Sequence, residues 1–202
     1  AEYIGYVKDG EVTLKYSTDD YPILMRECRT EDNKVFYKIY EPLNPEKQWR
    51  FSYTPEGVKP KNFINGLREL QELFGKLNAQ ADDEEDAPAR EQKIDEVIIC
   101  SGERDALCCR SMGYQPIWFN SETYQVTEED INLLFRYAKV IYNIPDIDST
   151  GVKKGTELAL RHIDVYTIWL PEWLSTFRDN RGKPRKDLRD WQELRRDIND
   201  FR

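Results

Sequence analysis

Four short and continuously apolar runs in the second half of the chain constrain its fold most. They cover residues 97–100, 117–119, 140–144 and 165–170, and helical patterns lie between them. Runs that are apolar at nearly every position are typical of strands buried on both faces of a parallel sheet. Strands that alternate with helices in this way predict an α/β fold, with a mostly parallel sheet flanked by helices and joined by right-handed crossovers.

Two helices in this half are predicted from their ends and their apolar faces. The side chain of Thr127 can cap a first turn of three acidic residues, and a second helix is expected from Asp187 onward. The first helix places Ile131, Leu134, Phe135 and Ala138 on one face, and the second places Leu188, Trp191, Leu194, Ile198 and Phe201 on one stripe. These apolar faces are expected to pack into the core.

The first part of the chain has a different pattern. Between residues 3 and 53 apolar and polar side chains alternate with period two, which predicts antiparallel strands, and Asp9-Gly10 and Asp32-Asn33 are suited to the hairpin turns. The clearest alternating sets are Val12, Leu14 and Tyr16; Val35, Tyr37 and Ile39; and Trp49, Phe51 and Tyr53. After Pro60 the period becomes helical, with Ile64, Leu67, Leu70, Phe74 and Leu77 on one face. A smaller α+β lobe, rich in antiparallel strands, is therefore expected to precede the parallel sheet.

These changes of pattern predict three segments. Residues 1–80 form the strand-rich lobe, residues 81–93 form an acidic linker loop that contains Asp82 to Asp86, and residues 94–202 form the domain with the parallel sheet and the C-terminal helix. With 202 residues, of which 39% are hydrophobic, the chain can bury one good core or two small ones.

Composition narrows the chemistry that the chain can perform. No apolar stretch approaches about 18 residues and no signal-peptide pattern opens the sequence, so we expect a cytoplasmic protein without a membrane partner. The four cysteines form no C-x-x-C pair and are expected to be buried thiols, and His162 is the single histidine. Nucleophilic catalysis by a Ser-His or Cys-His pair has little support. The remaining candidate is chemistry that depends on carboxylate side chains and a bound metal.

Acidic side chains follow two of the predicted strands. One motif runs from Cys100 to Leu107 with the sequence CSGERDAL, and the other runs from Asp146 to Gly151 with the sequence DIDSTG. Side chains two apart on an extended chain point the same way, so Asp146 and Asp148 can reach one hard cation. Open α/β sheets bind ligands at the carboxyl ends of their strands, so we expect a site there.

The second motif also fits another kind of site. Asp146, Asp148, Thr150, Gly151 and Glu157 occupy positions 1, 3, 5, 6 and 12 of a calcium-binding EF-hand loop. The preceding segment, however, has strand character and ends in a proline where an EF-hand needs an entering helix. A third interpretation is an acidic turn without a ligand. The sequence alone leaves these alternatives open.

Taken together, the two motifs resemble the Toprim domain of DnaG-type primases and of phage or mobile-element primase-helicases. The resemblance covers residues from about Ile94 to Trp191. The first lobe resembles the lobe that precedes Toprim in mobile-element primases, through the segments KIYEP from Lys38, WRF from Trp49 and NFINGL from Asn62. The family pattern combines Glu-Gly-x-x-Asp, Asp-x-Asp-x-x-Gly and a later acidic residue in a Lys-Asp setting. This chain has Gly102 with Asp105, Asp146 with Asp148, and Lys186-Asp187.

The resemblance implies a DNA-directed RNA polymerase of the primase type, a nucleotidyltransferase that uses Mg²⁺, with Mn²⁺ as a substitute. The implied catalytic residues are Glu103, Asp105, Asp146 and Asp148, and the implied metal ligands are Glu103, Asp146, Asp148 and Asp187. Ser101 stands where the family has its catalytic glutamate, and a serine is no carboxylate base. Glu103 is expected to substitute for that glutamate. The alternative is a degenerate Toprim module that binds nucleic acid or a replication partner without polymerising.

The implied partners are a single-stranded DNA template, nucleoside triphosphates and a replicative helicase. The net charge of −8 opposes binding of nucleic acid by bulk electrostatics, but residues 178–196 carry a local net charge of +4. The candidate phosphate contacts are Arg50, Lys59, Lys61, Arg185 and Lys186.

Neither a zinc-binding cysteine set nor a helicase P-loop is found, so the chain is expected to be a fragment of a larger phage or mobile-element replication protein. Nicking by a Toprim nuclease of another kind is a further alternative.

Overall fold

The computed structural model describes residues 1–8, 10–30, 32–81, 91–120 and 124–199. The chain forms two compact units, Ala1–Phe63 and Ile64–Arg202, which are described separately. The acidic run Asp82 to Asp86, Asp9 of the first expected turn and Phe201 lie outside the described residues. No helix in the described part is long and apolar enough to cross a membrane.

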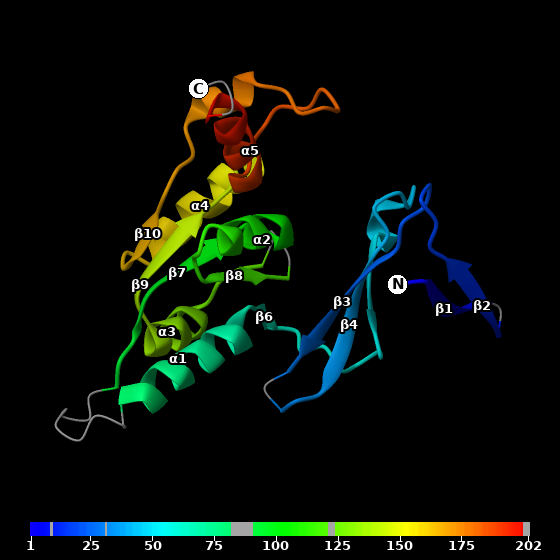
Figure 1. Ribbon diagram of the computed structural model, residues 1–202, viewed down its shortest axis with the longest axis horizontal. Helices are drawn as coiled ribbons and strands as arrows, with labels where there is room; N and C mark the ends of the chain where they lie inside the picture. The colour runs from blue at the N-terminus through cyan, green and yellow to red at the C-terminus, as the bar shows by residue number, and fades with distance from the viewer. Residues whose placement is uncertain (9, 31, 82–90, 121–123, 200–202) are drawn as a thin grey trace. The chain divides into compact units, whose positions relative to one another are not determined.

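The second unit contains a five-stranded sheet with the strand order β10-β9-β7-β8-β6 (Figure 1). Its strands are β6 (Ile64–Asn65), β7 (Ile94–Cys100), β8 (Pro116–Phe119), β9 (Ala138–Ile144) and β10 (Val165–Thr167). The pairs β10–β9, β9–β7 and β7–β8 are parallel, and only β6 runs antiparallel to its neighbour β8. The structure therefore confirms the predicted fold class, a mostly parallel sheet flanked by helices.

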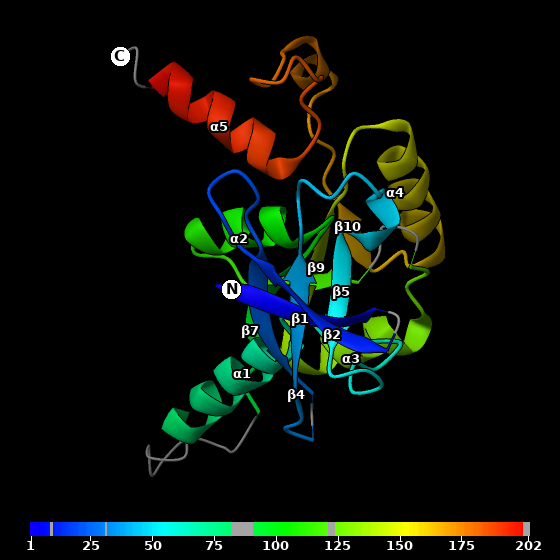
Figure 2. The same ribbon diagram turned by 90° about the vertical axis from the view of Figure 1, so that its right-hand side faces the viewer.

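Helices cover both faces of this sheet because its strands are apolar on both faces. Val97 and Ile99 of β7 belong to the core cluster that includes residues of α1 (Leu67–Ala81) and α3 (Glu128–Tyr137). Ile98 and Cys100 belong to a second cluster, which includes residues of α2 (Glu103–Ser111) and α5 (Leu188–Asn199). Helix α4 (Ser149–Arg161) packs on the first cluster through Leu158, and Figure 2 shows α2 on one side and α3 and α4 on the other.

Local sequence explains where two of these helices begin. Thr127 precedes α3 and forms a capping box, in which its side chain accepts a hydrogen bond from the Asp130 N–H and the Asp130 carboxylate accepts one from the Thr127 N–H. Asp148 precedes α4 and accepts a hydrogen bond from the Gly151 N–H at 2.8 Å. One of the two expected site carboxylates therefore also caps a helix.

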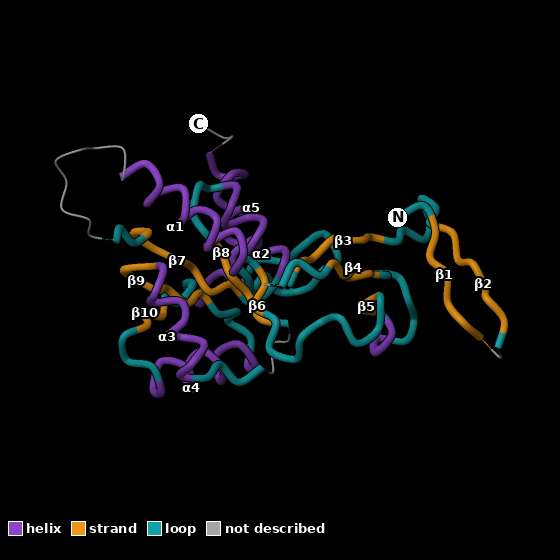
Figure 3. Tube along the Cα trace, turned by 90° about the horizontal axis from the view of Figure 1, so that it is seen from below, coloured by secondary structure: helices purple, strands orange, loops and turns teal. Residues whose placement is uncertain are grey.

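The first unit is built from antiparallel strands, as the alternating pattern predicts. A hairpin pairs β1 (Tyr3–Lys8) with β2 (Glu11–Tyr16), and a separate three-stranded sheet has the order β3-β4-β5 (Figure 3). The strands of that sheet are β3 (Leu24–Arg29), β4 (Val35–Tyr40) and β5 (Phe51–Thr54), with the 3-10 helix η1 (Lys47–Trp49) before β5. Gly10 and Asn33 have positive φ angles of 84° and 63°, which the hairpin turns require.

Several element boundaries differ from the prediction. Ile64, expected on the helix, lies in β6 and pairs with Phe119, and the helix begins only after Gly66. Gly66 has a φ of +84°, and a Cβ at this position would lie 2.5 Å from the carbonyl oxygen of Pro116. Close approach to β8 thus separates strand from helix. Trp49 lies in η1 rather than in a strand, and the last expected strand ends at Thr167, followed by the 3-10 helix η2 (Glu172–Thr176).

Two further expectations concern larger features. The segment before Asp146 is strand β9, so the EF-hand interpretation is wrong because its entering helix is replaced by a strand. Helix α1 belongs to the second compact unit, whereas the sequence assigned it to the first lobe. The two compact units describe how the chain packs, and they do not define domain boundaries. The predicted boundaries near residues 80 and 93 therefore stay a prediction.

Candidate metal and nucleotide site

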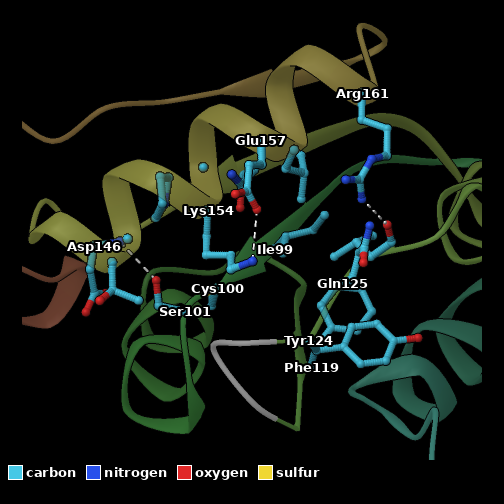
Figure 4. A pocket seen from close by; sticks show the side chains of 17 residues that line it. Ile99, Cys100, Ser101, Phe119, Tyr124, Gln125, Asp146, Lys154, Glu157 and Arg161 are labelled. Atoms are coloured by element: carbon cyan, nitrogen blue, oxygen red, sulfur yellow. Dashed lines mark hydrogen bonds and ion pairs between the residues drawn. The ribbon is translucent and has the colours of Figure 1, made fainter.

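The site begins where the parallel strands β7 and β9 end side by side. Ser101 follows β7, and its Oγ accepts a hydrogen bond of 3.0 Å from the Asp146 N–H and donates one of 3.4 Å to the Ile144 carbonyl oxygen (Figure 4). The hydroxyl group therefore ties the loop after β9 to the end of β7. Ser101, which the sequence marked only as a lost carboxylate, positions the backbone that carries Asp146.

Asp146 and Asp148 converge on one cation, the ammonium group of Lys186. Its Nζ lies 2.8 Å from Oδ2 of Asp146 and 2.5 Å from Oδ2 of Asp148. The Asp146 side chain is 9% exposed and that of Asp148 is 37% exposed, so one carboxylate is buried and the other reaches the surface. The Ile147 N–H donates to the Lys186 carbonyl oxygen at 2.9 Å, which holds this distant segment against the loop.

The charges of this triad stabilise one another. Burial raises the pKa of Asp148, but hydrogen bonds from Lys186 and from the Gly151 N–H outweigh that effect and lower it. Burial likewise opposes the charged form of Lys186, yet its two carboxylate partners raise the pKa of the ammonium group. Asp148 and Lys186 are therefore both expected to be ionised at neutral pH.

Asp105 and Asp187 lie near Asp146 and hold the start of α5. Asp187 directly precedes the helix, and its Oδ1 accepts a hydrogen bond of 2.7 Å from the Asp190 N–H while its Oδ2 pairs with Arg104 at 3.2 Å. Asp105 lies in the first turn of α2, and its Oδ1 accepts a hydrogen bond of 3.2 Å from the Arg189 N–H. Both carboxylates thus cap α5, the terminal helix, and Asp105 does not cap its own helix.

The environment of these two carboxylates favours their protonated forms. Burial, followed by the negative charges of Asp187 and Asp146, raises the pKa of Asp105 to about 7. Burial is also the main cause of the raised pKa of Asp187. Between about pH 4 and pH 7 the folded protein therefore holds a proton at Asp105 that the unfolded chain has released.

The substitution Asp105→Asn is expected to stabilise the protein at alkaline pH. The contribution of Asp105 to stability falls as the pH rises from about 4 to about 7, because the unfolded chain loses its proton first, whereas the neutral amide avoids this loss and can still accept from the Arg189 N–H. Urea unfolding in EDTA should show a gain of about 2–4 kcal/mol at pH 8 and almost none at pH 4. The exposed Asp164→Asn serves as the control, and a destabilised Asp105→Asn protein at pH 8 would contradict this assignment.

The donor chemistry of the Asp146–Asp148 pair fits Mg²⁺, which is commonly held by one or two carboxylates together with substrate phosphates. Across residues 1–8, 10–30, 32–81, 91–120 and 124–199, no group of three or more Asp, Glu, His or Cys side chains is placed to hold a metal. Glu103, the first residue of α2, and Asp187 are not grouped with the pair in this way. The expected four-residue ligand set therefore stays a prediction, of which the structure brings two members together.

The expected phosphate contacts have different environments. In the first unit, Lys61 is exposed, the Nε of Arg50 donates to the Asn44 carbonyl oxygen at 2.9 Å, and the Nζ of Lys59 lies 4.4 Å from the centre of the Tyr53 ring. Burial and the nearby charge of Lys38 lower the pKa of Lys59. In the second unit, the guanidinium of Arg185 donates to Glu193 at 3.1 Å and to the Asp190 carbonyl oxygen at 3.2 Å. Arg185 is therefore engaged with α5.

Sequence reasoning missed the structural roles of Ser101 and Lys186. It placed Lys186 among phosphate contacts, although the Lys-Asp motif already set a cation beside an expected site carboxylate. It also missed Asn143, a buried amide near the end of β9, three residues before Asp146. A polar side chain between the apolar Tyr142 and Ile144 was the available signal.

No protein-family model and no curated protein matches the sequence. Solved structures do. A DNA primase domain from Pseudomonas aeruginosa is 18% identical with a TM-score of 0.54, and the match covers 85% of this chain and 49% of that one. The Aquifex aeolicus primase, with its zinc-binding and RNA polymerase domains, is 19% identical with a TM-score of 0.54, covering 98% and 44%. A DnaG primase catalytic domain bound to single-stranded DNA is 17% identical with a TM-score of 0.53, covering 83% and 50%.

The chain spans about half the length of these structures. At such identities the matches establish the architecture, and they agree with the motifs at the ends of β7 and β9. The chain has the fold of DnaG-type primase catalytic cores, with a mostly parallel five-stranded sheet that extends from β6 to β10.

Proposed function

We propose that this chain is part of a DNA primase catalytic core, in which Asp146 and Asp148 hold Mg²⁺ together with a nucleoside triphosphate during RNA primer synthesis on single-stranded DNA. One observation supports this most: an oxygen of each carboxylate lies within 2.8 Å of the same cation, the Lys186 ammonium, at the carboxyl ends of parallel strands. A site that places two hard oxygens around one positive charge is suited to a divalent metal.

The metal would neutralise charge on the triphosphate and on the leaving pyrophosphate. In this proposal Mg²⁺ would compete with the Lys186 ammonium for the carboxylates of Asp146 and Asp148. Lys186 would then pair with phosphate oxygens. Ser101 keeps the backbone of Asp146 in place, since its Oγ accepts the Asp146 N–H. Asp148 retains its hydrogen bond from the Gly151 N–H, so the start of α4 fixes the direction of its carboxylate.

The partners follow from the same proposal. A matched structure is described as a primase catalytic domain bound to single-stranded DNA, and here the positively charged Arg50, Lys59 and Lys61 would bind template phosphates. The ammonium group of Lys59 over the Tyr53 ring combines charge with an aromatic face, as single-stranded nucleic-acid sites often do. A replicative helicase partner, a cytoplasmic location and an origin in a phage or mobile element belong to this proposal as well.

A primer-synthesis assay tests the function directly. The full chain is incubated with labelled ribonucleotides, Mn²⁺ and a mixed-sequence single-stranded DNA, and products are resolved by length. Products of two or more nucleotides that require both the DNA and the metal are expected. A parallel reaction contains end-labelled DNA, and cleavage of that DNA without nucleotide addition would instead support a Toprim nuclease and overturn the proposal.

The second candidate is a degenerate module that binds nucleic acid without polymerising, and Ser101 favours it. The substitution Ser101→Glu distinguishes the two functions, because it adds a carboxylate beside Asp146, at the position where the family has one. We expect Ser101→Glu to raise Mn²⁺ affinity about tenfold or more, since each additional carboxylate strengthens a hard-cation site. Electron paramagnetic resonance of Mn²⁺ provides the measurement, and Ser111→Glu on α2 is the matched control.

The two proteins then enter the primer assay. A Ser101→Glu protein that synthesises primers while the wild-type protein does not would establish the degenerate module. Synthesis by both, with the variant faster, supports the primase proposal.

A further inference from the structure

A cavity of about 100 Å³ lies beside the carboxylate pair, on the face of the sheet that α3 and α4 cover (Figure 4). Helix α4 forms one wall, the ends of β7 and β9 form the floor, and residues 119 and 124–126 form the opposite wall. Asp146 and Ser101 also line the cavity, so it adjoins the proposed metal and phosphate site. All of its described walls belong to the second compact unit.

The floor of the cavity holds a buried amide that the fold does not use. Asn143 is 6% exposed and pairs in register with Ile99, so the two side chains point to the same face, where both line the cavity. Among the described residues, no side-chain hydrogen bond involves the Asn143 carboxamide, and its polar atoms are not among those fully sealed from solvent, so the amide is open to the cavity. A polar group at the floor of a cavity is available to pair with a ligand that enters it.

The walls supply a flat surface and polar groups without a net charge. The rings of Phe119 and Tyr124 stack with their centres 4.9 Å apart and their planes 12° apart. Lys154 pairs with Glu157 at 2.9 Å, and Arg161 contacts the Val126 carbonyl oxygen at 3.5 Å (Figure 4). Because the lining cations Lys154 and Arg161 are balanced by Glu157 and Asp146, the cavity suits a neutral and planar molecule that forms hydrogen bonds at its edge.

We propose that this cavity binds the nucleobase of the nucleotide whose phosphates reach Asp146 and Asp148. An apolar cavity of about 150 Å³ accepts one benzene ring, so a volume of about 100 Å³ is too small for a two-ring purine, and a single-ring pyrimidine is the base that fits if its edge extends into the adjoining site. The Asn143 carboxamide offers both a donor and an acceptor, which match the edge of such a base. The link to the phosphates rests on the proposed function, whereas binding of the base depends only on the cavity.

Binding of uridine, which has no phosphate, to the full chain in EDTA tests the cavity alone. Saturable binding is expected by ligand-observed nuclear magnetic resonance, and D-ribose, which lacks the base, should not compete. Asn143→Leu keeps a similar volume and removes the amide, so we expect uridine affinity to fall about tenfold or more with thermal stability unchanged or increased. Arg161→Met, at an exposed position, provides a second variant with weakened binding if Asn143→Leu does not fold.

The outcomes separate this inference from the proposed function. Asp148→Asn should lose Mn²⁺ binding and still bind uridine like the wild-type protein, so a variant that retains both Mn²⁺ and uridine binding would overturn the metal site and support the pocket. Absence of saturable uridine binding, equal competition by ribose, or undiminished binding by folded Asn143→Leu would each overturn the pocket, even if Mn²⁺ still binds.

Discussion

Asp148→Asn is expected to abolish Mn²⁺ binding and to lower primer synthesis about a hundredfold or more while the protein remains folded. The amide cannot supply a charged oxygen to the metal, and loss of several kcal/mol of charge stabilisation corresponds to that change in rate. The fold should tolerate the change, because asparagine caps a helix about as well as aspartate and can still accept from the Gly151 N–H. Mn²⁺ titration, primer synthesis and thermal unfolding provide the three measurements.

Asp164→Asn is the matched control for this experiment, since Asp164 is exposed and lies outside the site. It should leave all three measurements unchanged. If Asp148→Asn binds Mn²⁺ as tightly as the wild-type protein, Asp148 is not a metal ligand. If the variant unfolds at the temperature at which the control remains folded, its role is that of a structural cap.

Lys186→Met should make the stability of the protein depend on divalent cations. Removing the ammonium group leaves the buried carboxylate of Asp146 and its neighbour Asp148 without their shared partner. Breaking a fully buried pair costs about 3–5 kcal/mol, and the 35% exposure of Lys186 reduces the expected loss to about 2–3 kcal/mol in EDTA. Mn²⁺ should restore this loss and bind more tightly than to the wild-type protein, because it no longer competes with Lys186.

The pair formed by Lys139 and Asp95 provides the control for this prediction. Their atoms lie 2.6 Å apart, but their side chains are 59% and 88% exposed, so Lys139→Met should cost about 0–1 kcal/mol and show no rescue by Mn²⁺. Urea unfolding of both variants with EDTA and with Mn²⁺ gives the comparison. A Lys186→Met protein that is destabilised equally with and without Mn²⁺ would mean that Lys186 is needed for the fold and that the two carboxylates do not accept a metal in its place.

The parts of the fold that depend on short-range pattern could be predicted. The apolar run of β9 predicted a buried strand and placed Asp146 and Asp148 at its end, and Thr127 with its acidic first turn predicted the start of α3. Local propensity and side-chain period determine such features, and both are visible in a window of a few residues.

Contacts between distant segments could not be read in the same way. Lys186 follows Asp148 by 38 residues, and Arg189 follows Asp105 by 84, so only the folded sheet and the packing of α5 on α2 bring them together. For the same reason Ile64 has a helical pattern with its neighbours but pairs with β8, because sheet hydrogen bonds outweigh local preference. The motifs predicted that Asp146 and Asp148 lie together at the end of a strand, but not that Lys186 is the cation they share.

The most direct test of the central claim is anomalous scattering from crystals of the full chain grown with Mn²⁺ and a non-hydrolysable nucleoside triphosphate. The account predicts a manganese peak bound by the carboxylates of Asp146 and Asp148, with the ammonium group of Lys186 moved from between them to the phosphates. Ordered triphosphate density without a manganese peak, with Lys186 still bridging the two carboxylates, would contradict the account.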